Sequence, residues 1–142
     1  MHNSSACPVC SGTKNPTADF CKRCRKIIDR PGPRRKKGDV VRKRDKEARR
    51  RALEEARVGK GFRCYYSGVR LIEDNPKDPR YLTFDHRIPR DESDVVVAAS
   101  LINDMKSDMT ESEFKKMVIQ LASRFKGGSF DNRVFNLKHW KR

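Results

Sequence analysis

Long hydrophobic runs are missing from this chain of 142 residues, and so is any excess of acidic side chains. Its longest hydrophobic run, Val95–Ala99, is far shorter than the roughly 18 residues that a membrane-spanning helix needs. Hydrophobic residues make up only 35% of the chain, whereas charged residues make up 37%. The composition therefore predicts a soluble protein with one modest core, and the length excludes a large multidomain enzyme.

A secretory signal is also missing, because the first residues have neither a basic start nor an apolar stretch behind them. We therefore expect the protein in a reducing cytoplasm, where cysteines remain thiols. Four of the five cysteines form two C-x-x-C pairs, with ten residues between the pairs. The pairs are Cys7 with Cys10 and Cys21 with Cys24.

Paired thiolates at this spacing form knuckle turns, and two knuckles complete the shell of four sulfur ligands that zinc prefers. Few apolar residues surround them, so we expect segment 1–30 to fold only around the metal. Two disulfides are the alternative in an oxidising compartment, and a redox pair would need a thioredoxin-like unit that the sequence lacks. The spacing therefore predicts a structural zinc ion.

Positive charge is concentrated between residues 30 and 63, where the chain has 15 basic and 5 acidic side chains. This segment therefore supplies most of the net charge of +15. Such a run can neutralise phosphates and release their counterions, so nucleic acid is the expected partner and a membrane is not. DNA is the first choice, although charge alone does not separate it from RNA. A solvated basic linker is the alternative. The candidate contacts here are Arg34, Arg35, Lys36, Lys37, Arg42, Lys43, Arg49 and Arg50.

Proline and glycine divide the chain into three segments. Pro31-Gly32-Pro33 stops any regular element and ends the cysteine segment. Strong helix formers predict a helix over 39–57, with a thin apolar face, inside a linker segment of residues 31–61. Only residues 62–142 have enough apolar residues for a compact core.

The third segment mixes strand and helix signals. Residues 62–66 and 81–84 are rich in aromatic and β-branched residues, as strands are, and 95–99 is a further apolar run. Thr110 and Glu113 have the spacing of a capping box, and the apolar residues that follow recur at helical intervals up to Phe125. The sequence therefore predicts a small α+β domain.

Asp85 and His86 end one of these predicted strands. Neighbours on a strand point to opposite faces, so one side chain can bind a metal ion while the other faces a reacting phosphate. Histidine suits the part of a general base because its ordinary pKa lies near neutrality. An Asp-His pair is, however, also common on protein surfaces, so the dipeptide alone decides nothing.

A longer pattern around this pair resembles the HNH endonuclease family. Its three blocks are Cys-Tyr-Tyr-Ser-Gly at 64–68, Leu-Thr-Phe-Asp-His-Arg-Ile-Pro at 82–89 and Asn-Asp-Met-Lys-Ser-Asp at 103–108. The resemblance implies a ββα-metal, treble-clef-like nuclease core, of the type found in phages or mobile elements, in a bacterial or phage-infected cell. The zinc module and basic helix would precede that core.

The resemblance also implies residue roles. His86 would be the general base, and Asp85 and Asn103 would bind one catalytic divalent ion, magnesium or manganese. Two protein oxygens leave most of the octahedral shell of magnesium open for water and substrate. Arg87 and Lys106 are the nearest cations that could position a phosphate, although either could be an ordinary surface charge.

The chain departs from the family at two places. Where many members bind a core zinc with four cysteines, it has Cys64, Ser67, Ala99 and Ile102, so we expect a buried free thiol and ordinary apolar packing. Asp94 stands where the family has an asparagine that holds the loop to the histidine. An aspartate can accept that hydrogen bond but cannot donate one.

Three functions remain at this point. The first is a metal-dependent DNA endonuclease with a zinc module and a basic helix that supply affinity, acting in packaging or recombination with partner proteins. The second is a junction-resolving endonuclease, which would need a homodimer. The third is a zinc-containing DNA-binding module that has lost activity, for which the Asp94 change is the argument.

Overall fold

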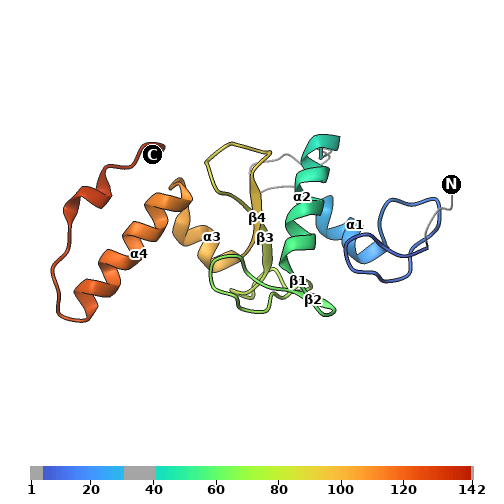
Figure 1. The fold of residues 1–142 in the computed structure, drawn as a ribbon, viewed down its shortest axis with the longest axis horizontal. Coiled ribbons are helices and arrows are strands. Elements are labelled where there is room, and N and C mark those ends of the chain that lie inside the picture. Colours follow the sequence, from blue (N-terminus) through green and yellow to red (C-terminus); the bar gives the residue numbers. More distant parts are fainter. Residues whose placement is uncertain (1–4, 31–40, 142) are drawn as a thin grey trace.

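The computed structural model describes residues 5–30 and 41–141 of the chain. The predicted phosphate contacts Arg34, Arg35, Lys36 and Lys37 lie outside the described residues. Described elements follow one another along an elongated molecule, with the cysteine segment at one end and the C-terminal helix at the other (Figure 1). In chain order they are α1 (Lys22–Ile28), α2 (Lys43–Ala56), β1 (Arg57–Val58), β2 (Gly61–Phe62), β3 (Leu82–His86), β4 (Val95–Ala99), α3 (Ser100–Lys106), α4 (Glu111–Phe125) and the 3-10 helix η1 (Asn132–Phe135).

An antiparallel hairpin forms the centre of the molecule. Strand β3 pairs with β4 from Leu82 opposite Ala99 to His86 opposite Val95. Helix α3 follows β4 without a connecting loop and packs back on both strands. The hairpin therefore carries Asp85 and His86 at one end, while the helix beside it carries Asn103.

Helix α2 covers one side of this hairpin (Figure 1). It begins at Lys43, so residues 41 and 42 of the predicted helix are not helical, and it ends at Ala56. Its narrow apolar face, which includes Ala48, Ala52 and Leu53, is buried. Two of these three residues are alanines, whose small side chains let the helix approach the strand closely. A thin apolar face is therefore sufficient for packing.

The cysteine segment shares its core with the hairpin. One continuous cluster of buried residues runs from Cys7 through Leu53 to Leu82 and Ala99. Arg30 donates hydrogen bonds to the carbonyl oxygens of Leu82 (2.8 Å) and Glu73 (2.6 Å). The three segments that the sequence divides are thus parts of one packed body.

The expected helix after Thr110 is confirmed. Thr110 and Glu113 form both hydrogen bonds of a capping box at the start of α4, and the helix ends at Phe125, just before Gly127. The expected strand over 62–66 is shorter, because the chain turns at Cys64, whose carbonyl accepts a bond from the Gly68 amide (2.8 Å). With two small antiparallel sheets beside its helices, the described part is a small α+β protein, as predicted. None of its helices is both long and apolar enough to cross a membrane.

Candidate functional site

The four cysteines of the N-terminal segment form a compact cluster. Their sulfur atoms all lie within 4.8 Å of one another. Cys7 follows a backbone bridge between Ala6 and Thr13, and Cys21 caps the N-terminus of helix α1, where its sulfur accepts from the Cys24 amide (3.4 Å). Local structure thus directs all four thiols to one point. The cluster can hold a metal ion such as zinc.

The thiols differ in acidity. Burial raises the pKa of Cys7, but hydrogen bonds from backbone amides of Cys21, Cys10 and Val9 outweigh it and lower this pKa to about 7. Burial keeps the pKa of Cys24 above its ordinary value, and the neighbouring sulfurs raise it further. A cluster in which thiolates crowd together favours a cation between them.

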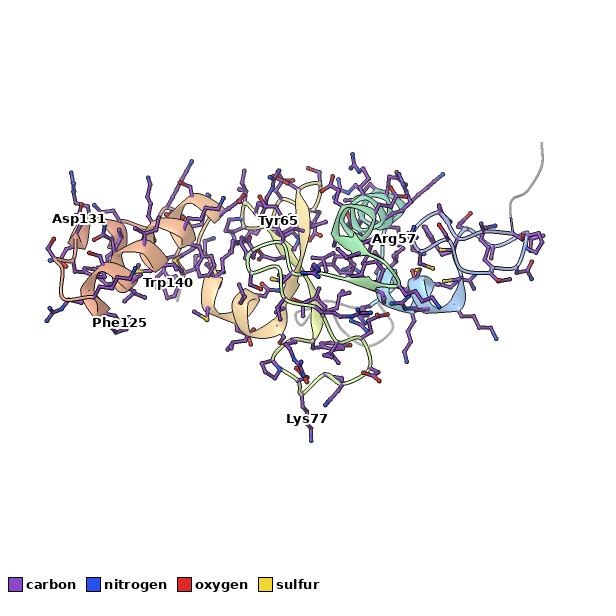
Figure 2. All side chains as sticks on the ribbon, turned by 60° about the horizontal axis from the view of Figure 1, so that its bottom comes forward. Arg57, Tyr65, Lys77, Phe125, Asp131 and Trp140 are labelled. Carbon is purple, nitrogen blue, oxygen red and sulfur yellow. The ribbon has the colours of Figure 1, made fainter. Side chains whose placement is uncertain are left out.

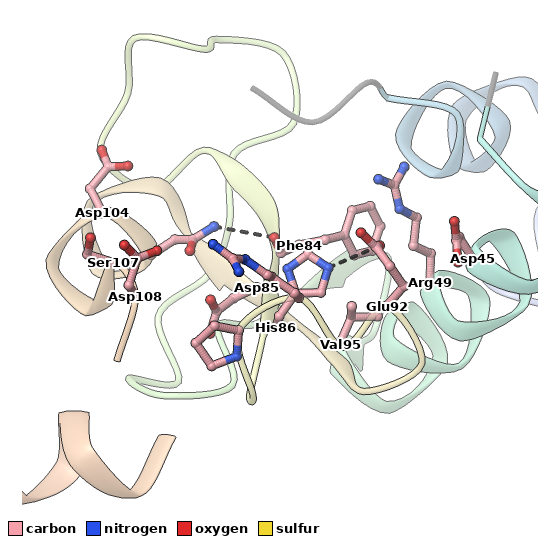
Figure 3. Close-up of a pocket in the computed structure, with 13 residues that line it drawn as sticks. Asp45, Arg49, Phe84, Asp85, His86, Glu92, Val95, Asp104, Ser107 and Asp108 are labelled. Atoms are coloured by element: carbon pink, nitrogen blue, oxygen red, sulfur yellow. Dashed lines mark hydrogen bonds and ion pairs between the residues drawn. The ribbon is translucent and has the colours of Figure 1, made fainter. Parts of the chain in front are cut away.

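A second site is a pocket of about 460 Å³ that opens between α2, the β3–β4 hairpin and α3 (Figure 3). It brings together the three residues that the family resemblance singles out, which are Asp85, His86 and Asn103. Several further polar residues also line it. These are Asp45, Arg49, Arg90, Glu92, Asp104, Ser107 and Asp108.

Asp85 lies at the inner side of this pocket and is 4% exposed. One carboxylate oxygen, Oδ2, accepts from the Tyr66 hydroxyl (2.5 Å), and the other, Oδ1, lies 3.3 Å from the Lys106 ammonium. Burial raises the pKa of Asp85, while Tyr66 and Lys106 oppose that rise. Burial and the neighbouring carboxylate also raise the pKa of Tyr66, which keeps its hydroxyl protonated as a donor.

His86 points to the other face of β3, as strand alternation predicts, and its side chain is 33% exposed. Its Nε2 atom lies 3.1 Å from Oε2 of Glu92, which the dashed line in Figure 3 marks. A carboxylate can only accept a hydrogen bond, so Nε2 carries the proton and Nδ1 is left as the basic nitrogen. Glu92 thus selects the ring tautomer.

Asn103 is oriented by strand β3. Its Nδ2 atom donates to the Thr83 hydroxyl (3.1 Å) and to the Phe84 carbonyl (3.3 Å). The Phe84 carbonyl can only accept, so the amide nitrogen must face it and the amide oxygen must point the other way. Among the described residues this oxygen has no hydrogen-bond partner, which leaves it available as a ligand.

Lys106, a candidate for positioning a phosphate or for an ordinary surface charge, is buried. Its side chain is 1% exposed, and its ammonium donates to the His86 carbonyl (2.7 Å) as well as to Asp85. The Lys106 ammonium therefore stabilises the end of β3 through these two bonds, and it is too deeply buried to contact a phosphate at the surface. Arg87 is half-buried, and its Nε donates to Asp94 (2.7 Å). This hydrogen bond to Asp94 is the main reason that the pKa of Arg87 is raised.

The basic residues of α2 fall into two groups. Arg42 and Lys43 are exposed at its N-terminal end. Arg49 is buried, and its guanidinium donates to the Ile28 carbonyl (2.6 Å) while it lines the pocket. Arg50 forms ion pairs with two glutamates of its own helix, Glu47 and Glu54. Of these four cations, only Arg42 and Lys43 are exposed.

The two departures from the family have structural consequences. Asp94 accepts from the Arg87 side chain, and its carbonyl accepts from the Arg87 amide (3.1 Å), so it closes the loop between β3 and β4. Cys64 is a buried free thiol, as expected, and accepts from the Ala99 amide (3.4 Å). Ala99 and Ile102 belong to the apolar core or pack against it.

Tyr66, Glu92 and Arg90 contribute to this site and are not predicted from the sequence. Tyr66 lies in the first family block, but nothing in its spacing shows that it would reach Asp85. Glu92 and Arg90 belong to the loop after β3 and line the pocket, and Arg90 has a positive φ of 70°. The conformation of this loop determines where Glu92 and Arg90 lie, and no periodic pattern in the sequence predicts that conformation.

Within the described ranges, the cysteine cluster is the only group of three or more His, Cys, Asp or Glu side chains close enough to hold a metal ion. A site built on Asp85 would therefore depend on the Asn103 amide oxygen and on water. Comparisons of the chain with protein-family patterns, with curated proteins and with solved structures find no match.

Proposed function

We propose that the protein is a metal-dependent DNA endonuclease of the HNH type, which hydrolyses phosphodiester bonds in the pocket between α2 and the hairpin. The observation that carries this proposal is the meeting of Asp85, His86 and Asn103 in one pocket. They come from a strand and from a helix, and the resemblance in sequence implies that these three residues are the general base and the two metal ligands.

The N-terminal cluster is proposed to bind a structural zinc ion. Tetrahedral zinc with sulfur ligands at about 2.3 Å separates neighbouring sulfurs by roughly 3.8 Å. The sulfurs of Cys10 and Cys21 lie 3.6 Å apart, which agrees with that geometry. All four ligands are sulfur, as in closed structural sites, so this ion would support the fold and leave no position for substrate.

Asp85 and Asn103 are the residues proposed to hold a catalytic magnesium or manganese ion. Both offer oxygen, the ligand that these ions prefer, and the Asn103 oxygen is oriented by strand β3. A bound divalent ion would offset the charge that develops on the phosphate and on the leaving oxygen. Lys106 and Tyr66 fix the Asp85 carboxylate before any ion arrives.

His86 is the proposed general base. Its Nδ1 accepts a proton from the attacking water, while Glu92 holds Nε2 and stabilises the imidazolium that forms. Arg90, which is exposed and lines the pocket, takes the phosphate-positioning part that Lys106 cannot take from its buried position. A positively charged guanidinium suits that task because it forms two parallel hydrogen bonds to phosphate oxygens.

Cleavage of supercoiled plasmid tests the proposal. We expect magnesium-dependent nicking by the zinc-loaded protein, and His86→Ala should reduce the rate by about 10² to 10⁴ because a positioned base contributes that much. Magnesium is added or omitted without chelator, so that the cysteine cluster keeps its metal. The measurement is the rate of loss of supercoiled DNA on a gel.

His139→Ala is the matched control, because His139 is half-buried in the C-terminal segment and does not line the pocket. It should cleave like the wild type. If the folded wild type shifts DNA on a gel but never cleaves it, the hydrolase proposal fails and the inactive DNA-binding module replaces it.

Arg42 and Lys43 give a separate prediction about binding. Because each exposed cation releases about one counterion when it contacts a phosphate, the double variant Arg42→Ala/Lys43→Ala should reduce the slope of log affinity against log salt by about 2. Fluorescence anisotropy with a labelled duplex over a salt series measures this slope. Lys116→Ala/Lys141→Ala, at exposed positions in the C-terminal part of the chain, should leave it unchanged.

A further inference from the structure

The Asn103 side chain can be a metal ligand only when its amide oxygen faces the pocket. Half a turn of an asparagine amide exchanges its oxygen and its nitrogen, so the surrounding hydrogen bonds must fix which end points outward. Two acceptors on β3 bind the nitrogen end here, the Thr83 hydroxyl (3.1 Å) and the Phe84 carbonyl (3.3 Å). A carbonyl always accepts, whereas a hydroxyl can donate as well as accept. The direction of the Thr83 bond therefore depends on where the Thr83 proton goes.

Strand β4 takes the Thr83 proton. Thr83 lies opposite Ala98 in the register of the hairpin, and its hydroxyl donates to the Ala98 carbonyl (2.9 Å). A threonine hydroxyl has one proton, so Thr83 can meet Asn103 only with a lone pair. If the Asn103 amide were turned the other way, its oxygen would face the Thr83 lone pairs and the Phe84 carbonyl oxygen. Both contacts would be repulsive, so the amide keeps its oxygen toward the pocket.

The Ala98 carbonyl is held firmly enough to fix this direction. Ala98 is fully buried, and strand β4 is bonded to two neighbours. One neighbour is β3, and the other is the Tyr65 amide, which donates to the Val97 carbonyl (2.8 Å). Figure 2 shows Tyr65 beside the hairpin. The hydrogen bonds thus run in one direction, from the Asn103 amide on α3 through the Thr83 hydroxyl on β3 to β4.

We propose that Thr83 is a positioning residue for the catalytic metal ion, because its bond to Ala98 obliges Asn103 to present the amide oxygen. This inference rests on the proposed function, in which Asp85 and Asn103 hold that ion. Thr83 does not line the pocket, so it acts through Asn103 and touches neither metal nor substrate. Residues that orient a metal ligand in this way change the metal affinity by about 10- to 100-fold.

A purely structural part for Thr83 would have a different signature. The bond from Thr83 to Ala98 joins the two strands of the hairpin, so its loss would lower the stability of the protein. It would not change the affinity of the folded protein for a metal ion. Thr83→Val keeps the shape of the side chain and removes the hydroxyl, whereas Thr83→Ser keeps the hydroxyl. The two variants therefore separate positioning from packing.

Manganese binding to the zinc-loaded full chain, without DNA, tests the proposal. Electron paramagnetic resonance measures the free Mn²⁺ that remains at each point of a titration. Asn103→Ala first identifies the binding that depends on the amide. We expect Thr83→Val to weaken that binding by about tenfold, the lower end of the range for residues that orient a ligand, because the Phe84 bond still holds the amide in part. Thr83→Ser should bind manganese like the wild type.

Thr17→Val is the matched control, since the exposed Thr17 hydroxyl also bonds an asparagine, Asn15 (2.9 Å), but in the N-terminal segment. It should leave manganese binding unchanged. Circular dichroism checks the fold of each variant, and Thr83→Ala replaces Thr83→Val if the latter does not fold. Equal manganese affinity in the wild type and in a folded variant without the Thr83 hydroxyl overturns the inference and leaves the proposed metal site standing. Manganese binding that Asn103→Ala does not change overturns that site as well.

Discussion

Cys24→Ser is expected to unfold the central hairpin as well as the N-terminal segment. Cys24 is fully buried in the cluster, and a structural zinc site contributes roughly 10 to 16 kcal/mol to folding, which matches or exceeds the whole stability of a typical domain of about 5 to 15 kcal/mol. Because the cysteine segment and the hairpin share one core, the loss cannot remain local. Zinc content by mass spectrometry and amide hydrogen exchange across β3 measure the two effects together.

Cys64→Ala is the control for this experiment. Cys64 is also buried, but it lies outside the cluster and bonds only weakly to the Ala99 amide. We expect it to cost about 1 kcal/mol, as ordinary core substitutions do, and to leave the zinc content unchanged. If Cys24→Ser loses zinc while the amides of β3 stay protected, the shared core does not couple the two parts.

Lys106→Met should destabilise the protein by about 3 to 5 kcal/mol near neutral pH. The ammonium is buried against the Asp85 carboxylate, and removing one partner of a buried pair leaves the other charge uncompensated. Burial already raises the pKa of Asp85, so its contribution to stability is greatest below the pKa of an unfolded aspartate and falls as the pH rises through the folded pKa. Lys106 opposes that fall.

The loss in Lys106→Met should therefore grow as the pH rises from acid toward neutrality. Urea unfolding at several pH values measures it, and the double variant Lys106→Met/Asp85→Asn should recover part of the stability because neither charge remains. Lys115→Met, which removes an exposed cation paired with Glu111 on α4, should leave the stability almost unchanged, because solvent screens exposed ion pairs. A loss in Lys106→Met that is small at every pH would show that the pair does not hold the end of β3.

Local signals in the sequence predict the elements that local interactions determine. The capping box at Thr110 predicts the start of α4, because both of its hydrogen bonds lie within one turn. The C-x-x-C spacing predicts the cysteine cluster for the same reason, since each pair of thiols is oriented by its own turn. The shortened strand at Phe62 shows the limit of such signals, because the turn at Cys64 overrides the β-branched and aromatic content around it.

Long-range contacts account for what could not be predicted. Tyr66 and Asp85 are 19 residues apart and meet only because the hairpin and the preceding loop fold together. Lys106 is a partial exception. It lies three residues after Asn103 on α3, so the two side chains share a face of that helix, and an inward-facing lysine could have been inferred from this spacing. The spacing could not show that the Asp85 carboxylate would be the partner of this lysine.

The two hydrogen bonds from Arg30 to Leu82 and Glu73 limit when the N-terminal segment can complete its folding during synthesis. Their acceptors lie 52 and 43 residues further along the chain, so the N-terminal segment leaves the ribosome well before its partners do. Contacts this distant in sequence slow folding, because a long loop must close before they form. We therefore expect the nascent cysteine segment to bind zinc early. It should reach its full stability only after β3 and β4 have emerged. During that interval the cell's thiol chemistry has access to the cysteines.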